Sequence, residues 1–156
     1  MIKRLNEIIK NGNLEFGLFD EKTKISTTNL DNQIIYMHPT DTSLVFYSEI
    51  IHIDYVFEST HPYLFRDILA VQSISHRYGN LCISLDTSSR ILWFNYSISL
   101  EGIDTETLKA SVYSFAGNVS EYSNYVRNAI FTSEEDIESQ KENTPLNDIN
   151  DLTHLV

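Results

Sequence analysis

Cysteine and glycine are scarce in this sequence. Cys82 is the only cysteine among 156 residues, so an internal disulfide cannot form and no multi-cysteine metal site is indicated. Such usage is typical of a protein in a reducing compartment. The five glycines form no phosphate-binding loop of the Walker or dinucleotide type, so nothing indicates a nucleotide site.

Long apolar runs and positive charge are also lacking. No stretch is long enough to cross a bilayer, and the N-terminal MIKRLNEIIKNG is charged and lacks the apolar region of a signal peptide. We therefore expect a soluble intracellular protein. The formal net charge of -11 disfavours nucleic acid and anionic membranes as partners, because both repel an acidic surface.

Acidic residues concentrate at the C-terminal end of the chain. Residues 132–156 hold seven acids and one lysine, which accounts for -6 of the net charge of -11. Because they also lack a sustained apolar pattern, we expect a folded domain over 1–131 and an acidic, disordered tail over 132–156. The alternative is a short helix formed on a partner, for which the tail has three spaced apolar residues: Leu146, Ile149 and Leu152.

Apolar residues make up 42% of the chain, enough for the core of one domain, and their spacing predicts its elements. Isoleucine and leucine at helical spacing, ended by Asn11-Gly12, predict a short first helix. Short runs rich in Ile, Val, Tyr and Phe predict an antiparallel meander of three strands, at Lys24–Thr28, Gln33–His38 and Ser43–Ile53.

The second half of the chain continues with helices and strands. Pro62 and Gly79 suit the start and the end of a second helix. Leu81–Leu85 and Ile91–Leu100 flank a polar turn and predict a hairpin. Asp104 suits the N-cap of a long third helix. The apolar residues of that helix alternate steps of four and three: Leu108, Val112, Phe115, Val119, Tyr122, Val126 and Ala129.

The order of elements is α-β-β-β-α-β-β-α, which is not the strict alternation of a parallel design. It predicts an α+β fold, in which three helices pack against a twisted antiparallel sheet of about five strands.

Ile91 and Trp93 fall on the face of the last strand that side-chain alternation assigns to water. The second predicted helix likewise has an apolar arc too broad for a single contact. Surplus apolar and aromatic surface of this kind favours a subunit interface. The alternative is that Trp93 covers the edge of the chain's own core.

Catalytic and metal-ligating patterns are weak. The five histidines lack ligand spacing, and His52 with Asp54 suits chance placement at a strand end better than a metal site or a dyad. Cys82 alternates out of phase with its apolar neighbours, and a small, partly buried hydrophobe is favoured over a nucleophile. We expect no enzymatic activity and no cofactor.

Residues 69–126, LAVQSISHRYGNLCISLDTSSRILWFNYSISLEGIDTETLKASVYSFAGNVSEYSNYV, resemble the class I type III secretion chaperones, the group that includes the Tir chaperone. A helix leads into a short strand, a turn, an aliphatic strand, the polar break S-L-E-G-I-D and a long amphipathic helix. The N-terminal helix and the meander also fit, so the resemblance covers about residues 1–131. Two features depart from the family: the tail is longer and more acidic, and the polar first strand leaves the register of the meander open.

This resemblance implies a homodimer in the bacterial cytoplasm that is not an enzyme. Each dimer holds the N-terminal chaperone-binding segment of one or a few secreted effectors, keeps it extended and soluble, and delivers it to the secretion apparatus, with the secretion ATPase as a further partner. A sheet edge can accept such a segment as an added strand, and apolar grooves can accept its alternate side chains. Neither a cofactor, nor nucleic acid, nor membrane insertion is implied.

By position in the family's fold, the resemblance implies two sets of apolar residues. Those expected to help form the effector groove are Ile2, Leu5, Ile8, Ile9, Phe16, Leu18, Ile35 and Phe46. Those expected at or near the dimer contact are Leu64, Ile68, Val71, Ile74, Ile91 and Trp93. For each residue the alternative is ordinary packing in the chain's own core.

Two other classes of function fit the same composition. An acidic immunity or inhibitor protein binds a folded basic toxin by charge complementarity, but here the acids concentrate in the tail rather than on the body. A small enzyme using Cys82 or a histidine is the third class, and thiol alkylation without loss of function would argue against it.

Overall fold

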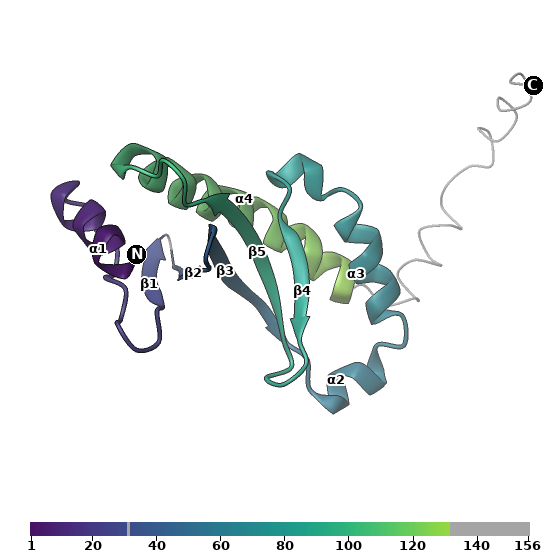
Figure 1. Cartoon of the computed structure of the whole chain (residues 1–156). Helices are drawn as coiled ribbons and strands as arrows, with labels where there is room; N and C mark the ends of the chain where they lie inside the picture. The colour runs from purple at the N-terminus through teal and green to yellow at the C-terminus, as the bar shows by residue number, and fades with distance from the viewer. Residues whose placement is uncertain (31, 132–156) are drawn as a thin grey trace, which may run out of the picture.

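The computed structural model describes residues 1–30 and 32–131, so the predicted tail lies outside the described residues. In Figure 1 the sheet lies across the long C-terminal helix. The elements in chain order are α1 (Ile2–Asn11), β1 (Ser26–Leu30), β2 (Gln33–Pro39), β3 (Ser43–His52), α2 (Tyr55–Thr60), α3 (Leu64–Gln72), the 3-10 helix η1 (Ser75–Tyr78), β4 (Cys82–Asp86), β5 (Ile91–Ser99) and α4 (Thr105–Phe131).

The five strands form one antiparallel sheet in the order β1-β2-β3-β5-β4. β1, β2 and β3 pair as the expected meander, with Ser26 opposite Met37 and Met37 opposite Phe46. β3 then pairs with β5, so the hairpin of β4 and β5 joins the sheet through its second strand. The predicted α+β fold and the order of its elements are confirmed.

The segment predicted as the second helix is more broken than the sequence suggested. A single helix was predicted between Pro62 and Gly79, whereas α2 precedes Pro62, α3 begins at Leu64 and the short η1 follows. The signal for α2 is Asp54, whose side chain accepts a hydrogen bond from the backbone N–H of Phe57 at 2.7 Å and so caps the helix. Pro62 lies in the linker between the two helices.

Gly79 ends η1 in the left-handed region, with φ of 67°. A Cβ at this position would lie 2.3 Å from Nδ2 of Asn118 on α4. We expect Gly79→Ala to lower the free energy of unfolding by roughly 1–2 kcal/mol, measured by urea unfolding. Gly117→Ala is the matched control, because a Cβ there has nothing within 4 Å and alanine favours the helix by about 1 kcal/mol. A loss of stability in the control, or none in Gly79→Ala, would contradict this account.

Helix α4 closes the core against one face of the sheet and contacts β2, β3, β5 and α3. The ring of Phe115 lies 5.7 Å from that of Phe46 on β3. The hydroxyl of Tyr122 donates a hydrogen bond to the backbone carbonyl of Val71 on α3, and burial raises the pKa of Tyr122 to about 12. The predicted stripe of α4 is buried at Leu108, Val112, Phe115, Val119, Tyr122 and Val126.

Alternation along the strands gives the sheet two different faces. The face toward α4 is buried over the central strands, as at Ile35 and Phe46. The alternate side chains of the central strands point away from α4, and most of them are only partly buried. This second face is termed the open face and is marked by Tyr36, Tyr47 and Trp93.

Candidate functional site

Three aromatic rings from three neighbouring strands gather on the open face. Trp93 on β5 lies 5.6 Å from Tyr36 on β2 and 6.4 Å from Tyr47 on β3, measured between ring centroids. Both pairs are close to perpendicular, with interplanar angles of 83° and 79°. Trp93 therefore falls on the face assigned to water because it belongs to an aromatic cluster there.

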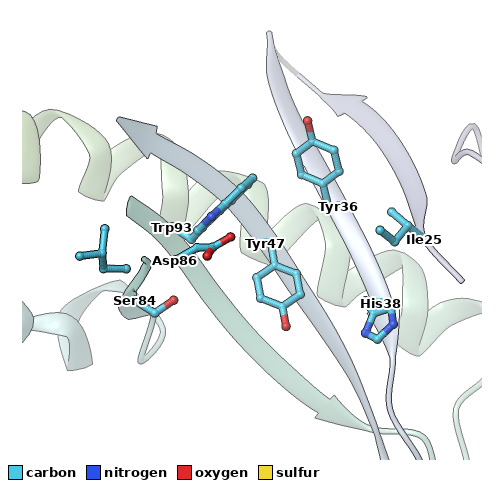
Figure 2. A pocket seen from close by; sticks show the side chains of 8 residues that line it. Ile25, Tyr36, His38, Tyr47, Ser84, Asp86 and Trp93 are labelled. Atoms are coloured by element: carbon cyan, nitrogen blue, oxygen red, sulfur yellow. The ribbon is translucent and has the colours of Figure 1, made fainter. Parts of the chain in front are cut away.

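This cluster lines a hollow of about 630 Å³, a volume typical of sites that hold a small ligand or a few side chains of a partner. Figure 2 shows the side chains around it, with Tyr47 between Trp93 and His38. The remaining lining residues come from the N-terminal approach to β1 and from β2 and β4: Ile25, His38, Ser84, Leu85 and Asp86.

The charges on the sheet are of one sign. None of the five strands contains a lysine or an arginine, and their two acids are Glu49 and Asp86. Glu49 is exposed and lies directly opposite Trp93 in the pairing of β3 with β5. The open face therefore combines aromatic rings with carboxylates.

Asp86 begins the turn between β4 and β5 and organises it. Its carboxylate accepts hydrogen bonds from the backbone N–H and the hydroxyl of Ser88, at 2.9 and 2.7 Å, and from the hydroxyl of Ser89 at 2.8 Å. These bonds, with the Ser88 hydroxyl as the largest cause, lower the pKa of Asp86 to about 2. The carboxylate at the rim of the hollow is thus charged at neutral pH.

This lowered pKa predicts a pH dependence of stability. Because the folded pKa of about 2 lies below the ordinary 3.8, Asp86 stabilises the fold above pH 3.8, and the contribution is lost as the pH falls toward 2. We expect Asp86→Asn to reduce the fall in melting temperature over that range, with Asp41→Asn as the control for an equal change of charge. Parallel acid profiles for the wild type and Asp86→Asn would contradict the assignment.

Both edges of the sheet are partly occupied by the chain itself. At β1, the backbone N–H of Asp20 donates to the carbonyl of Ile25 at 3.1 Å, and the N–H of Gly17 donates to the hydroxyl of Thr28 at 3.2 Å. At β4, the side chain of Gln72 accepts from the N–H of residue 83 and donates to the carbonyl of residue 81. The open face consequently offers more room for a partner than either edge.

A second apolar surface lies on α2 and α3. It is termed the helical patch and consists of Tyr55, Val56, Phe65 and Leu69, with exposed fractions of 75%, 71%, 48% and 71%. The guanidinium of Arg90 lies over the ring of Tyr55, at 4.0 Å from its centroid. Large apolar side chains this exposed on two successive helices favour a protein interface.

The structure places most of the predicted groove residues in the core. Leu18 is exposed, Ile2 and Ile8 are partly buried, and the rest of that set are buried: Leu5, Ile9, Phe16, Ile35 and Phe46. Hydrophobic periodicity marks the side of an element that avoids water, and here that side faces α4 and the sheet. A role in effector binding stays a prediction for the whole set, and for these five it has no support from surface exposure.

The predicted dimer residues divide in the same way. Ile74 and Ile91 are partly buried, Trp93 belongs to the open face, and the remaining three are buried in the chain's own core: Leu64, Ile68 and Val71. Phe65 and Leu69 lie beside this buried stripe of α3 and belong to the helical patch. The sequence showed the width of the apolar arc, but the residues assigned to the dimer contact came from its buried stripe, and Phe65 and Leu69 lie outside that stripe.

Residues considered for catalysis are not brought together. Asp54 caps α2. Cys82 was predicted to be partly buried, and this is wrong because it is exposed. It lies on the edge strand β4, where most side chains are exposed. Within the described ranges, no group of three or more His, Cys, Asp or Glu could hold a metal ion, and no helix is long and apolar enough to cross a membrane.

Solved structures with the same fold include chains of three protein complexes. A chain of the HopA1–SchA chaperone–effector complex has 13% sequence identity and a TM-score of 0.57, over 79% of this chain and 94% of that chain. A chain of the ExsC–ExsE complex has 16% identity and a TM-score of 0.57, over 85% and 95%. A chain of the heterodimeric ExoU–SpcU complex, from the type III secretion system of Pseudomonas aeruginosa, has 11% identity and a TM-score of 0.50, over 81% and 96%.

The same fold also occurs in an uncharacterized protein from Methanothermobacter thermautotrophicus, with 12% identity and a TM-score of 0.54, over 83% of this chain and 99% of that chain. No family model and no curated protein sequence matches. Identities this low establish the fold alone. The resemblance to class I type III secretion chaperones is confirmed at that level: this chain has the fold of a chain in a chaperone–effector complex and of a chain in a type III secretion complex.

Proposed function

We propose that this protein is a class I type III secretion chaperone in the bacterial cytoplasm. It binds the N-terminal segment of one or more secreted effectors, keeps the segment extended and soluble, and hands it to the secretion apparatus. Binding rather than catalysis is its activity. The observation that carries this proposal is the aromatic cluster on the open face, placed on a fold that also occurs in a chaperone–effector complex.

The open face suits an extended segment. An extended chain presents side chains on alternate sides, so one set can enter the hollow beside Trp93 while the backbone lies across the strands. Aromatic rings give a large apolar contact at little cost in side-chain entropy. A segment ordered in this way loses conformational entropy, which a long contact along the sheet must offset.

The helical patch suits a second copy of the chain. Val56 and Leu69 are each 71% exposed, and a two-fold contact would bury both copies of such groups at once. In a dimer formed this way, the open faces of both subunits stay free for one cargo segment. The acidic charge of -11 keeps a carrier with exposed apolar surface in solution.

Co-expression tests this function. The chain is produced with the N-terminal segment of a secreted protein encoded beside it, and light scattering measures the mass of the complex. We expect a soluble complex with two copies of the chain, which Trp93→Asp abolishes. Tyr125→Asp, which changes an exposed ring on α4, is the control and should leave the complex intact.

The result also separates the chaperone from the acidic inhibitor. An inhibitor would remain a monomer of 18.0 kDa and would bind a folded basic protein through a preformed polar surface. Failure of Trp93→Asp to affect cargo, with the complex otherwise intact, would remove the open face from the proposal.

A further inference from the structure

The open face has a chemical preference as well as a shape. Its strands offer carboxylates and π-electron faces but neither lysine nor arginine. Ring faces carry negative potential, and so do the carboxylates of Glu49 and Asp86. Every fixed charge of the strands on this face therefore favours a cation in the partner.

The rings are arranged so that a flat cation can reach them. Tyr36 and Tyr47 both stand nearly perpendicular to the indole of Trp93, so neither is stacked on it, and Trp93 is only partly buried. Tryptophan is the best aromatic partner for a cation. Trp93 is also central, since both tyrosines contact it.

Acidic groups flank the indole on two sides. Glu49 is the cross-strand partner of Trp93 on β3, where directly opposed side chains lie about 5 Å apart at Cβ. Asp86 lines the hollow from the end of β4, and its place is set by the bonds to Ser88 and Ser89. The two carboxylates therefore belong to the strands on either side of the strand that carries Trp93, and Asp86 is the one that lines the hollow itself.

We propose that the hollow receives an arginine side chain of the bound extended segment, whose guanidinium stacks on Trp93 and pairs with the carboxylates of Glu49 and Asp86. Arginine is favoured over lysine because its planar group can stack on a ring and bond a carboxylate at the same time. The volume of about 630 Å³ also leaves room for the apolar neighbours of that arginine, which meet Ile25 and Leu85. This inference rests on the proposed function, since it names the chemistry of the cargo at the same site.

The fluorescence of Trp93 tests the proposal directly, because it is the only tryptophan in the chain. The full-length protein is titrated with three blocked tripeptides, acetyl-Val-Arg-Val-amide and its lysine and citrulline versions. Citrulline keeps the shape of arginine without the charge. We expect saturable binding of the arginine peptide, binding about tenfold weaker for citrulline, and an intermediate affinity for lysine.

Variants locate the cation. Glu49→Gln should weaken binding of the arginine peptide several-fold and leave the affinity for the citrulline peptide unchanged. Glu121→Gln removes an equal charge from an exposed position on α4, away from the open face, and should change neither. Glu49 is exposed, so its substitution leaves the core intact.

Three results would overturn the inference. Equal affinity for the arginine and citrulline peptides would show an apolar site without charge selection, and the proposed function would stand. An equal loss of affinity for the arginine peptide in Glu49→Gln and Glu121→Gln would show that the acidic protein attracts the cationic peptide in general, without a specific site. No response to any peptide, together with a changed solution mass in Glu49→Gln, would show that a second copy covers the hollow. The co-expression experiment assesses the chaperone function independently, because its cargo is not chosen for arginine.

Discussion

Leu69→Asp is expected to reduce the solution mass from twice 18.0 kDa to 18.0 kDa. Leu69 is a residue of the helical patch and is 71% exposed on α3, so an aspartate there costs the folded monomer little. In a two-fold dimer the change enters the contact twice and places carboxylates in an apolar interface, which disfavours association strongly. Light scattering over a range of protein concentrations measures the effect.

Trp93→Asp is the matched variant for this experiment, because the two surfaces make opposite predictions. If the helical patch forms the dimer, Trp93→Asp remains a dimer and loses only cargo. If Trp93 instead lies at the dimer contact, as the sequence predicts, Trp93→Asp is monomeric and Leu69→Asp remains a dimer. A wild-type protein that is monomeric at every concentration would contradict both.

Phe115→Ala is expected to lower the free energy of unfolding by about 3–5 kcal/mol. Phe115 is 1% exposed and packs between α4 and the sheet against Phe46, so its removal leaves a cavity that the sheet cannot close. Against a total stability of roughly 5–15 kcal/mol for a domain, this loss is a large share. Urea unfolding measures it at one fixed protein concentration, because dimerisation would also contribute to the apparent stability.

Tyr113→Ala on the same helix is the control for Phe115→Ala. Tyr113 is half exposed and its ring lies 6.0 Å from that of Phe16, so we expect a loss of no more than about 1.5 kcal/mol. Similar losses for the two variants would mean that α4 does not close the core as described. The comparison also excludes a general effect of helix propensity, since both changes introduce alanine.

The architecture was largely predictable because it depends on local periodicity. The steps of four and three in α4 and the runs of β2, β3 and β5 each reflect one side of an element avoiding water, and the structure buries those sides. Asp104 caps α4 as predicted, with its carboxylate accepting from the N–H of Thr107 at 2.8 Å. The fragmented helical region before β4 was not predicted, because the cap at Asp54 was overlooked.

The candidate site was predictable only in outline. The position of Trp93 on the outer face followed from its phase in the strand, and so did the presence of surplus apolar surface. Its neighbours Tyr36 and Tyr47 lie 57 and 46 positions earlier in the chain, and no spacing rule links them to Trp93. Apolar periodicity also cannot separate a buried stripe from an interface. Leu64 and Val71, which the sequence assigned to the dimer contact, are buried in the subunit's own core.

An acidic α+β domain with one cysteine, a long amphipathic final helix and a tryptophan on the outer face of a strand all follow from the sequence. These properties depend on composition and on contacts between residues close in the chain. The pairing of β3 with β5 comes from the fold, and it brings Glu49 opposite Trp93 and the two tyrosines beside it. The physical reason is that strand order depends on which apolar faces α4 can cover together, a choice made by packing across the whole domain.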